Sequence, residues 1–120
     1  MKYRIGVATS DGIVVNQHFG RASAFQIIDV DDRGEMTVVE QRTLEPICQG
    51  GDHDDNQMAQ TVEKLSDCDY ILVSRIGQRA ADALEQSGIG AYELPGIIEE
   101  SVRKLIAYAE VQKMLAGHIN

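Results

Sequence analysis

The stretch Tyr70-Ile71-Leu72-Val73, followed by Ser74-Arg75-Ile76-Gly77, decides the fold of this 120-residue chain. Its first four residues are too few and too β-branched for a helix, and turn-forming residues flank them. A strand that is apolar at every position is typical of a sheet with parallel strands and helices on both faces. The stretch therefore predicts an α/β fold.

Helical patterns lie on both sides of this strand. Before it, apolar residues recur at helical spacing over about residues 55–67, and Asp55 can cap that helix. After it, we expect a second helix over about residues 77–87 and a short strand over residues 90–94. A long last helix should follow Pro95-Gly96. Its apolar positions are Ile98, Val102, Leu105, Ile106 and Ala109.

The first half of the chain predicts three further strands. Residues 2–9 form the first, and residues 25–30 and 36–42 form an antiparallel hairpin. Residues 43–55 are expected to form a loop. The order is β-β-β-α-β-α-β-α, and right-handed crossovers make the later strands parallel to the first. We expect one domain over residues 1–120, with a mixed five-stranded sheet in a three-layer α/β/α arrangement.

Composition and charge narrow the class of protein. With 43% hydrophobic residues the chain can bury one core, and its formal net charge of -8 would repel a phosphate backbone. We therefore expect no nucleic-acid partner. The sequence shows no signal peptide and no run of membrane-spanning length, which favours the cytoplasm and no membrane partner. Cys48 and Cys68 are then expected to be thiols, with Cys68 in the core.

Ligands of open α/β sheets collect beyond the carboxyl ends of the parallel strands. The loop after the first strand contains His18-Phe19-Gly20-Arg21, in which the imidazole of His18 can bind a soft or borderline metal. Arg21 can offset negative charge on a ligand. The alternative is a histidine that only hydrogen-bonds the loop backbone. Phe19 is expected to be a core side chain beneath the loop.

A second loop contains Cys48-Gln49-Gly50-Gly51-Asp52-His53. A thiolate and an imidazole suit a cluster of iron or mixed metals, and Gly50 and Gly51 permit close approach of the backbone. One cysteine and one histidine do not make a structural zinc site, which needs four ligands. The alternative is an acidic loop with an incidental thiol.

A third segment is the turn Ser74-Arg75-Ile76-Gly77. Exposed amides at the start of a helix and the guanidinium groups of Arg75 and Arg79 are typical of an anion receptor. Sulfide-rich clusters usually carry negative charge. The alternative is that Arg75 pairs with one of the many acidic side chains.

The motifs of several common enzyme classes are absent. The sequence contains no G-x-S-x-G elbow, P-loop or G-x-G-x-x-G, and residues 2–9 contain no carboxylate for two-metal nuclease chemistry. We therefore expect a binding protein and not an enzyme, although an enzyme of unknown type stays open.

Four motifs stand in order along essentially the whole chain: Val15-Asn16-Gln17-His18-Phe19-Gly20, Cys48-Gln49-Gly50-Gly51, Val73-Ser74-Arg75-Ile76-Gly77 and Gly88-Ile89. Together they resemble the dinitrogenase iron-molybdenum cofactor biosynthesis family. This family comprises NifX-type carriers, stand-alone relatives of unknown role and the C-terminal domain of NifB, whose wider setting is nitrogen fixation.

The resemblance implies a ribonuclease H-like α/β/α fold and transient binding of an iron–sulfur or iron-molybdenum-sulfur cluster during cofactor biosynthesis. It implies cofactor-assembly proteins as partners, and His18, Cys48 and His53 as metal ligands. A regulatory or interaction domain for a small anion or another molybdenum-containing sulfide cluster is the alternative. The expected cofactor-binding residues are His18, Gly20, Arg21, Gly50, Gly51, Ser74, Arg75 and Gly77.

Overall fold

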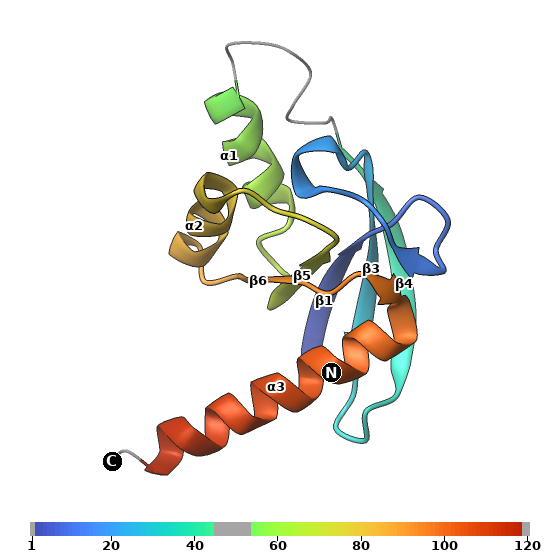
Figure 1. Ribbon diagram of the computed structural model, residues 1–120, viewed down its shortest axis with the longest axis vertical. Coiled ribbons are helices and arrows are strands. Elements are labelled where there is room, and N and C mark those ends of the chain that lie inside the picture. Colours follow the sequence, from blue (N-terminus) through green and yellow to red (C-terminus); the bar gives the residue numbers. More distant parts are fainter. Residues whose placement is uncertain (1, 45–53, 119–120) are drawn as a thin grey trace.

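A mixed five-stranded sheet organises the computed structural model, which describes residues 2–44 and 54–118 (Figure 1). Its strands lie in the order β4-β3-β1-β5-β6. They are β1 (Tyr3–Ala8), β3 (Ala24–Val30), β4 (Met36–Thr43), β5 (Tyr70–Val73) and β6 (Gly90–Glu93). β3 is antiparallel to β1 and β4, whereas β5 is parallel to β1 and β6. The predicted hairpin and the predicted parallel strands are confirmed.

Helices cover both faces of this sheet (Figure 1). α1 (Asp54–Lys64) and α2 (Gln78–Gln86) pack on one face, and α3 (Ile98–His118) packs on the other. β5 contributes side chains to the cores on both faces, because successive side chains of a strand point to opposite faces of the sheet. Ile71 and Val73 belong to the core under α1 and α2, and Leu72 belongs to the core under α3. The α/β class predicted from this strand is confirmed.

The core under α1 and α2 contains the buried cysteine. Leu65 of the turn after α1 and Leu84 of α2 are fully buried there, and Cys68 is 4% exposed. Burial raises the pKa of the Cys68 thiol to about 12, so this thiol stays protonated at neutral pH. Cys68 is a core residue, as the sequence predicted.

The sequence pattern does not predict three short elements. β2 (Val14–Val15) and β7 (Gly96–Ile97) form a separate two-stranded sheet, and η1 (Phe19–Arg21) is one turn of 3-10 helix. Elements of two or three residues are too short to show a periodicity. β7 uses Gly96 at a φ of +127°, a backbone conformation that residues with a side chain rarely adopt.

The ends of α1 differ from the prediction. The helix begins at Asp54, so Asp55 lies in its first turn and not at the predicted cap, and it ends at Lys64 before a turn. Helix ends depend on local hydrogen bonds, and sequence pattern locates them poorly. No helix within residues 2–44 and 54–118 is long and apolar enough to cross a membrane.

Asp67 joins three parts of the fold through charged side chains. Its carboxylate accepts hydrogen bonds from Arg42 of β4 (Nη2 to Oδ2, 2.6 Å) and Arg4 of β1 (Nη1 to Oδ2, 2.9 Å). Arg4 also pairs with Asp29 of β3 (Nε to Oδ1, 2.7 Å). The hydrogen bonds from Arg42 hold the pKa of Asp67 well below its usual range, although partial burial acts in the opposite direction.

We expect the free energy of unfolding to fall as the pH drops below about 4. The ordinary pKa of an aspartate is 3.8 and that of native Asp67 is lower, so the native state binds fewer protons than the unfolded state. The stabilisation is complete above the ordinary value and is lost as the pH falls toward the native value. Urea unfolding at several pH values should show a weaker acid dependence in Asp67→Asn. Asp32→Asn, which changes an exposed carboxylate in the hairpin turn, should behave as wild type. Equal acid dependence in all three proteins would contradict this role of Asp67.

Candidate functional site

The loop after β1 lies beside the turn after β5, although the two are far apart in the sequence. The Ser74 N–H donates to the Gln17 carbonyl (3.0 Å), and the Phe19 N–H donates to the Arg75 carbonyl (2.8 Å). His18 and Arg75 therefore form an isolated parallel bridge. This backbone pairing continues the parallel sheet beyond β5 and places two predicted site residues side by side.

Phe19 anchors the loop from beneath. Its side chain is 1% exposed, and its ring packs against the ring of Phe25 on β3, with 5.9 Å between the centroids. Burying a phenylalanine in this way contributes roughly 1.5–3 kcal/mol. The prediction that Phe19 is a core side chain is confirmed. Because Phe19 points inward, His18 is held at the surface, where it is exposed.

Helix α2 begins directly after the turn and presents its positive end there. Gly77 occupies the N-cap position without a side-chain cap, and the first turn contains no acidic residue. The first N–H groups of the helix are therefore available to an anion. A Cβ atom at Gly77 would meet nothing within 4 Å, so the backbone is open to an approaching ligand.

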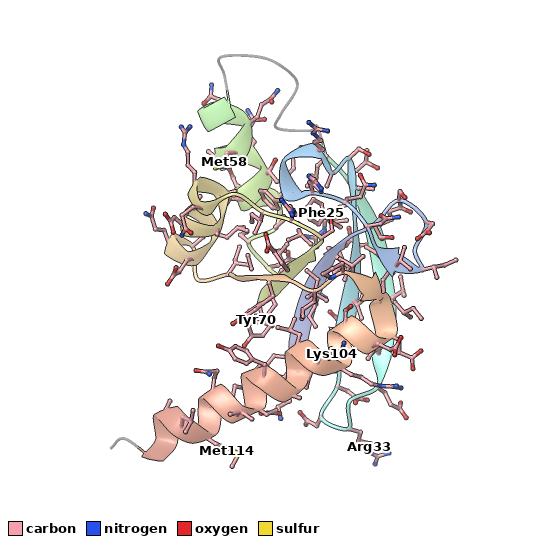
Figure 2. The ribbon with its side chains drawn as sticks, viewed as in Figure 1. Phe25, Arg33, Met58, Tyr70, Lys104 and Met114 are labelled. Atoms are coloured by element: carbon pink, nitrogen blue, oxygen red, sulfur yellow. The ribbon has the colours of Figure 1, made fainter. Side chains whose placement is uncertain are left out.

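A cavity of about 410 Å³ lies between η1, the turn after β5 and the helices α1 and α2. This volume falls within the range of about 300–1,000 Å³ that is usual for small-molecule sites. Figure 2 shows Met58, which lines this cavity, on α1 close to α2. Five predicted site residues line it: His18, Gly20, Arg21, Arg75 and Gly77. The other lining residues are Phe19, Met58, Ile76, Arg79 and Ala80.

Two arginines of this cavity have no carboxylate partner among the described residues. Within residues 2–44 and 54–118, neither Arg21 nor Arg75 forms an ion pair, whereas Arg4 and Arg42 are both bound to carboxylates. Within that part of the chain, Arg75 therefore does not pair with an acidic side chain, which was the alternative interpretation. Two exposed guanidinium groups in a chain of net charge -8 make a local positive surface.

Ser74 does not line the cavity. Its Oγ atom is buried and has no hydrogen-bond partner among the described residues, and its N–H holds the loop through Gln17. The structure therefore gives Ser74 a backbone role in this turn. The sequence analysis expected Ser74 among the cofactor-binding residues, and the structure leaves it outside the lining of this cavity.

Four predicted site residues, Cys48, Gly50, Gly51 and His53, lie outside the described residues. Within the described ranges, no group of three or more histidine, cysteine, aspartate or glutamate side chains could hold a metal ion. The described lining of the cavity offers one imidazole, from His18, together with positive charge. It suits an anionic ligand with a single metal–protein bond better than a bare metal ion.

Glu93 is a residue that sequence reasoning missed. It ends β6, where it pairs in register with Val73, and its Oε2 accepts a hydrogen bond from the Ile76 N–H (2.8 Å). The strand that carries Ser74 and Arg75 is thus held on one edge by residues 17–19 and on the other by Glu93 and Leu94. No sequence motif signals this contact, because it depends on the register between β5 and β6.

A second cavity, of about 640 Å³, lies on the other side of the sheet, between β4, β7 and the start of α3. Its walls include exposed apolar side chains, Ile13, Val38 and Ile97. Its described lining includes no imidazole or thiol, and the one arginine there, Arg103, is paired with Glu99. The smaller cavity beside His18 therefore has the better chemistry for an anionic metal cluster.

Comparisons with known proteins agree in one family. The family model described as dinitrogenase iron-molybdenum cofactor matches residues 1–108. The chain is 36% identical over 104 residues to the FeMo cofactor biosynthesis protein NifB of Frankia alni, covering 84% of this chain and 20% of that protein. NifB of Chlorobaculum tepidum is 34% identical over 99 residues, covering 82% and 22%. The chain thus spans about a fifth of the length of these relatives.

Two solved structures resemble the fold. One is the crystal structure of PH0822, with a TM-score of 0.64, 22% identity, and coverage of 87% of this chain and 90% of that chain. The other is the NMR structure of a putative NifB protein from Thermotoga (TM1290), with a TM-score of 0.52, 23% identity, and coverage of 90% and 88%. At these identities the likeness concerns the fold alone, and it agrees with the α/β class.

We expect Glu93→Ala to loosen the turn that carries Arg75, whereas Glu93→Gln should keep it, because a side-chain amide oxygen can still accept from the Ile76 N–H. The alanine variant should lose about 0.5–1.5 kcal/mol of stability, the usual value of one hydrogen bond. Amide exchange measured by NMR should speed up at Ile76 in that variant alone. Unchanged exchange at Ile76 in Glu93→Ala would contradict the contact.

Proposed function

The chain belongs to the dinitrogenase iron-molybdenum cofactor family, and we propose that it holds a preformed metal–sulfur cluster between two steps of cofactor assembly. The cluster is cargo, and the chain does no covalent chemistry of its own. The observation that supports this most is the bridge between His18 and Arg75. This bridge puts the His18 imidazole, proposed as a metal ligand, and the Arg75 guanidinium on the wall of the same cavity.

Charge is the first part of the proposed binding. An iron–sulfur or iron-molybdenum-sulfur cluster rich in sulfide carries negative charge. Arg21, Arg75 and Gly77 line the cavity, and the amides after Gly77 form the positive end of α2. At about 4 Å, one such charge pair is worth roughly 1 kcal/mol in water and about 4 kcal/mol near a protein surface. Because the site is exposed, salt should screen this attraction.

Ligation is the second part. His18 is exposed on an anchored loop, so its imidazole can replace an outer ligand of a cluster without movement of the core. Cys48 and His53 are proposed as further ligands, with Gly50 and Gly51 allowing the backbone to approach. A carrier needs few ligands, because a full set of thiolates would hold the cluster too tightly to pass it on.

Partner proteins and a cellular location are also part of the proposed function. Cofactor-assembly proteins would donate and accept the cluster, since relatives of this chain are named for FeMo cofactor biosynthesis. A cytoplasmic location fits the thiol expected at Cys48 and a cluster that oxidation would destroy. A ribonuclease H-like relationship of the sheet remains a prediction from the family resemblance.

The charge component can be tested with tetrathiomolybdate, whose visible absorption reports binding under anaerobic conditions. We expect Arg75→Ala and Arg21→Ala each to weaken binding at least about tenfold at low salt, because each removes a positive charge from the cavity wall. Arg33→Ala is the matched control. Figure 2 shows Arg33 on the β3–β4 turn, far from Met58 and the cavity, so this variant should bind as wild type.

Three results would count against the charge component or its assignment. Absence of any binding by wild type would overturn the carrier proposal for this cargo. An equal loss in Arg33→Ala would mean that net charge and not the cavity is responsible. Displacement by millimolar inorganic phosphate would favour the alternative, a domain that binds small anions.

The ligand assignment can be tested with a synthetic thiolate-ligated [4Fe–4S] cluster. We expect His18→Ala and Cys48→Ala each to reduce uptake of the cluster and to shift its charge-transfer bands, because each would remove a proposed metal ligand. Cys68→Ala is the matched control, since the Cys68 thiol is buried and protonated. Uptake that is unchanged in both ligand variants would refute the assignment while leaving the charge component intact.

A further inference from the structure

We propose that the projecting half of α3 pairs with the same segment of a second copy of this chain. Four large side chains of this segment are about half to two-thirds exposed: Tyr108 (47%), Val111 (50%), Met114 (66%) and Leu115 (53%). Residues three and four apart on a helix lie on one face, so these four form a continuous apolar stripe, here called the α3 stripe. The inference is independent of the proposed function.

Apart from Tyr108, whose ring packs against Tyr92 of β6, the side chains of the α3 stripe are exposed and lack a packing partner among the described residues. The other face of α3 packs on the sheet through residues up to Ala109, and residues 111–116 are all exposed. Figure 1 shows this part of the helix extending away from the sheet. The family model ends at residue 108, so most of the stripe lies beyond the region shared with the family. An apolar helix face without a packing partner gains stability when another surface covers it.

Charge favours a second copy at this place. Two chains of net charge -8 repel each other over most of their surfaces. Between residues 107 and 116 the only charged side chains are Glu110 and Lys113, which cancel. Both turn toward the N-terminal strand, where Glu110 pairs with Lys2 and the Lys113 ammonium lies 4.6 Å from the centre of the Tyr3 ring. Two copies can therefore meet along the stripe without opposing like charges.

The stripe is also complementary to itself. If two α3 helices lie antiparallel with a two-fold axis at Val111, Tyr108 of each copy lies near Met114 and Leu115 of the other. This is the arrangement of an isologous dimer. Tyr108 already packs against Tyr92 of β6, with 5.5 Å between ring centroids, so part of the contact surface is ordered before association.

The area of contact sets the expected strength. Four large side chains per copy are far fewer than the roughly 20–30 residues on each side of a standard interface. We therefore expect a reversible dimer with a dissociation constant on the order of 10–100 μM. Such a dimer leaves the cavity beside His18 uncovered, because that cavity is formed by η1, α1 and α2 and not by α3.

Sedimentation of the full chain from about 5 μM to about 1 mM tests the proposal. Wild type should shift from 13.2 kDa toward twice that mass as its concentration rises. Val111→Glu should weaken association at least about tenfold, because it sets two carboxylates against each other at the axis. Ala116→Glu adds the same charge to an exposed position about 140° around the helix and should associate as wild type.

Each other result decides against the proposal. A mass of 13.2 kDa at every concentration would overturn the proposal and favour a different protein as the binding partner of the stripe. Dimerisation that survives Val111→Glu, or that Ala116→Glu abolishes equally, would place the interface elsewhere. A positive check is mild oxidation of Val111→Cys, which should give a disulfide-linked dimer that Ala116→Cys does not give. Circular dichroism of each variant establishes that α3 remains helical.

Discussion

The backbone pairing of residues 17–19 with residues 74–75 is the interaction on which the candidate site depends. β5 is paired with β1 up to Leu72, and the strand ends at Val73. In the turn that follows, the backbone groups need other hydrogen-bond partners on both sides. The loop after β1 closes one edge and β6 closes the other. Since buried backbone groups must find hydrogen-bond partners, this closure fixes where His18 and Arg75 stand. The cavity is thus a consequence of how the parallel strands end.

The distribution of ion pairs explains how an acidic chain keeps a positive cavity. Arg4, near the start of β1, is bound by Asp29 and Asp67, and Arg42 of β4 is bound by Asp67 and Glu40. These ion pairs stabilise the fold, and they neutralise part of the negative charge of the chain. Arg21 and Arg75 stand on the surface without such partners in the described ranges, where water solvates them at little cost. The result is local positive charge that the overall charge of -8 conceals.

The sequence predicted what depends on apolar pattern and missed what depends on register. Tyr70–Val73 was recognisable as a strand because every residue is apolar, and Phe19 and Cys68 were recognisable as core residues by their type and position. The sheet β2–β7 and the contact of Glu93 with the Ile76 amide arise from the folded alignment of distant segments, for which a single sequence carries no signal. The sequence could group His18 with Arg75 in a cavity only through the rule that loops of parallel strands meet at one end of the sheet.

The same geometry bears on how a bound cluster would be released. Two guanidinium groups and the end of one helix attract any anion of suitable size, and an attraction of about 4–8 kcal/mol alone corresponds to millimolar to micromolar binding. Charge therefore cannot by itself distinguish one sulfide cluster from another. A bond from His18 to a metal adds directional strength that depends on an available position on the cluster. In such a site charge governs capture, and exchange at His18 governs how long the cargo stays.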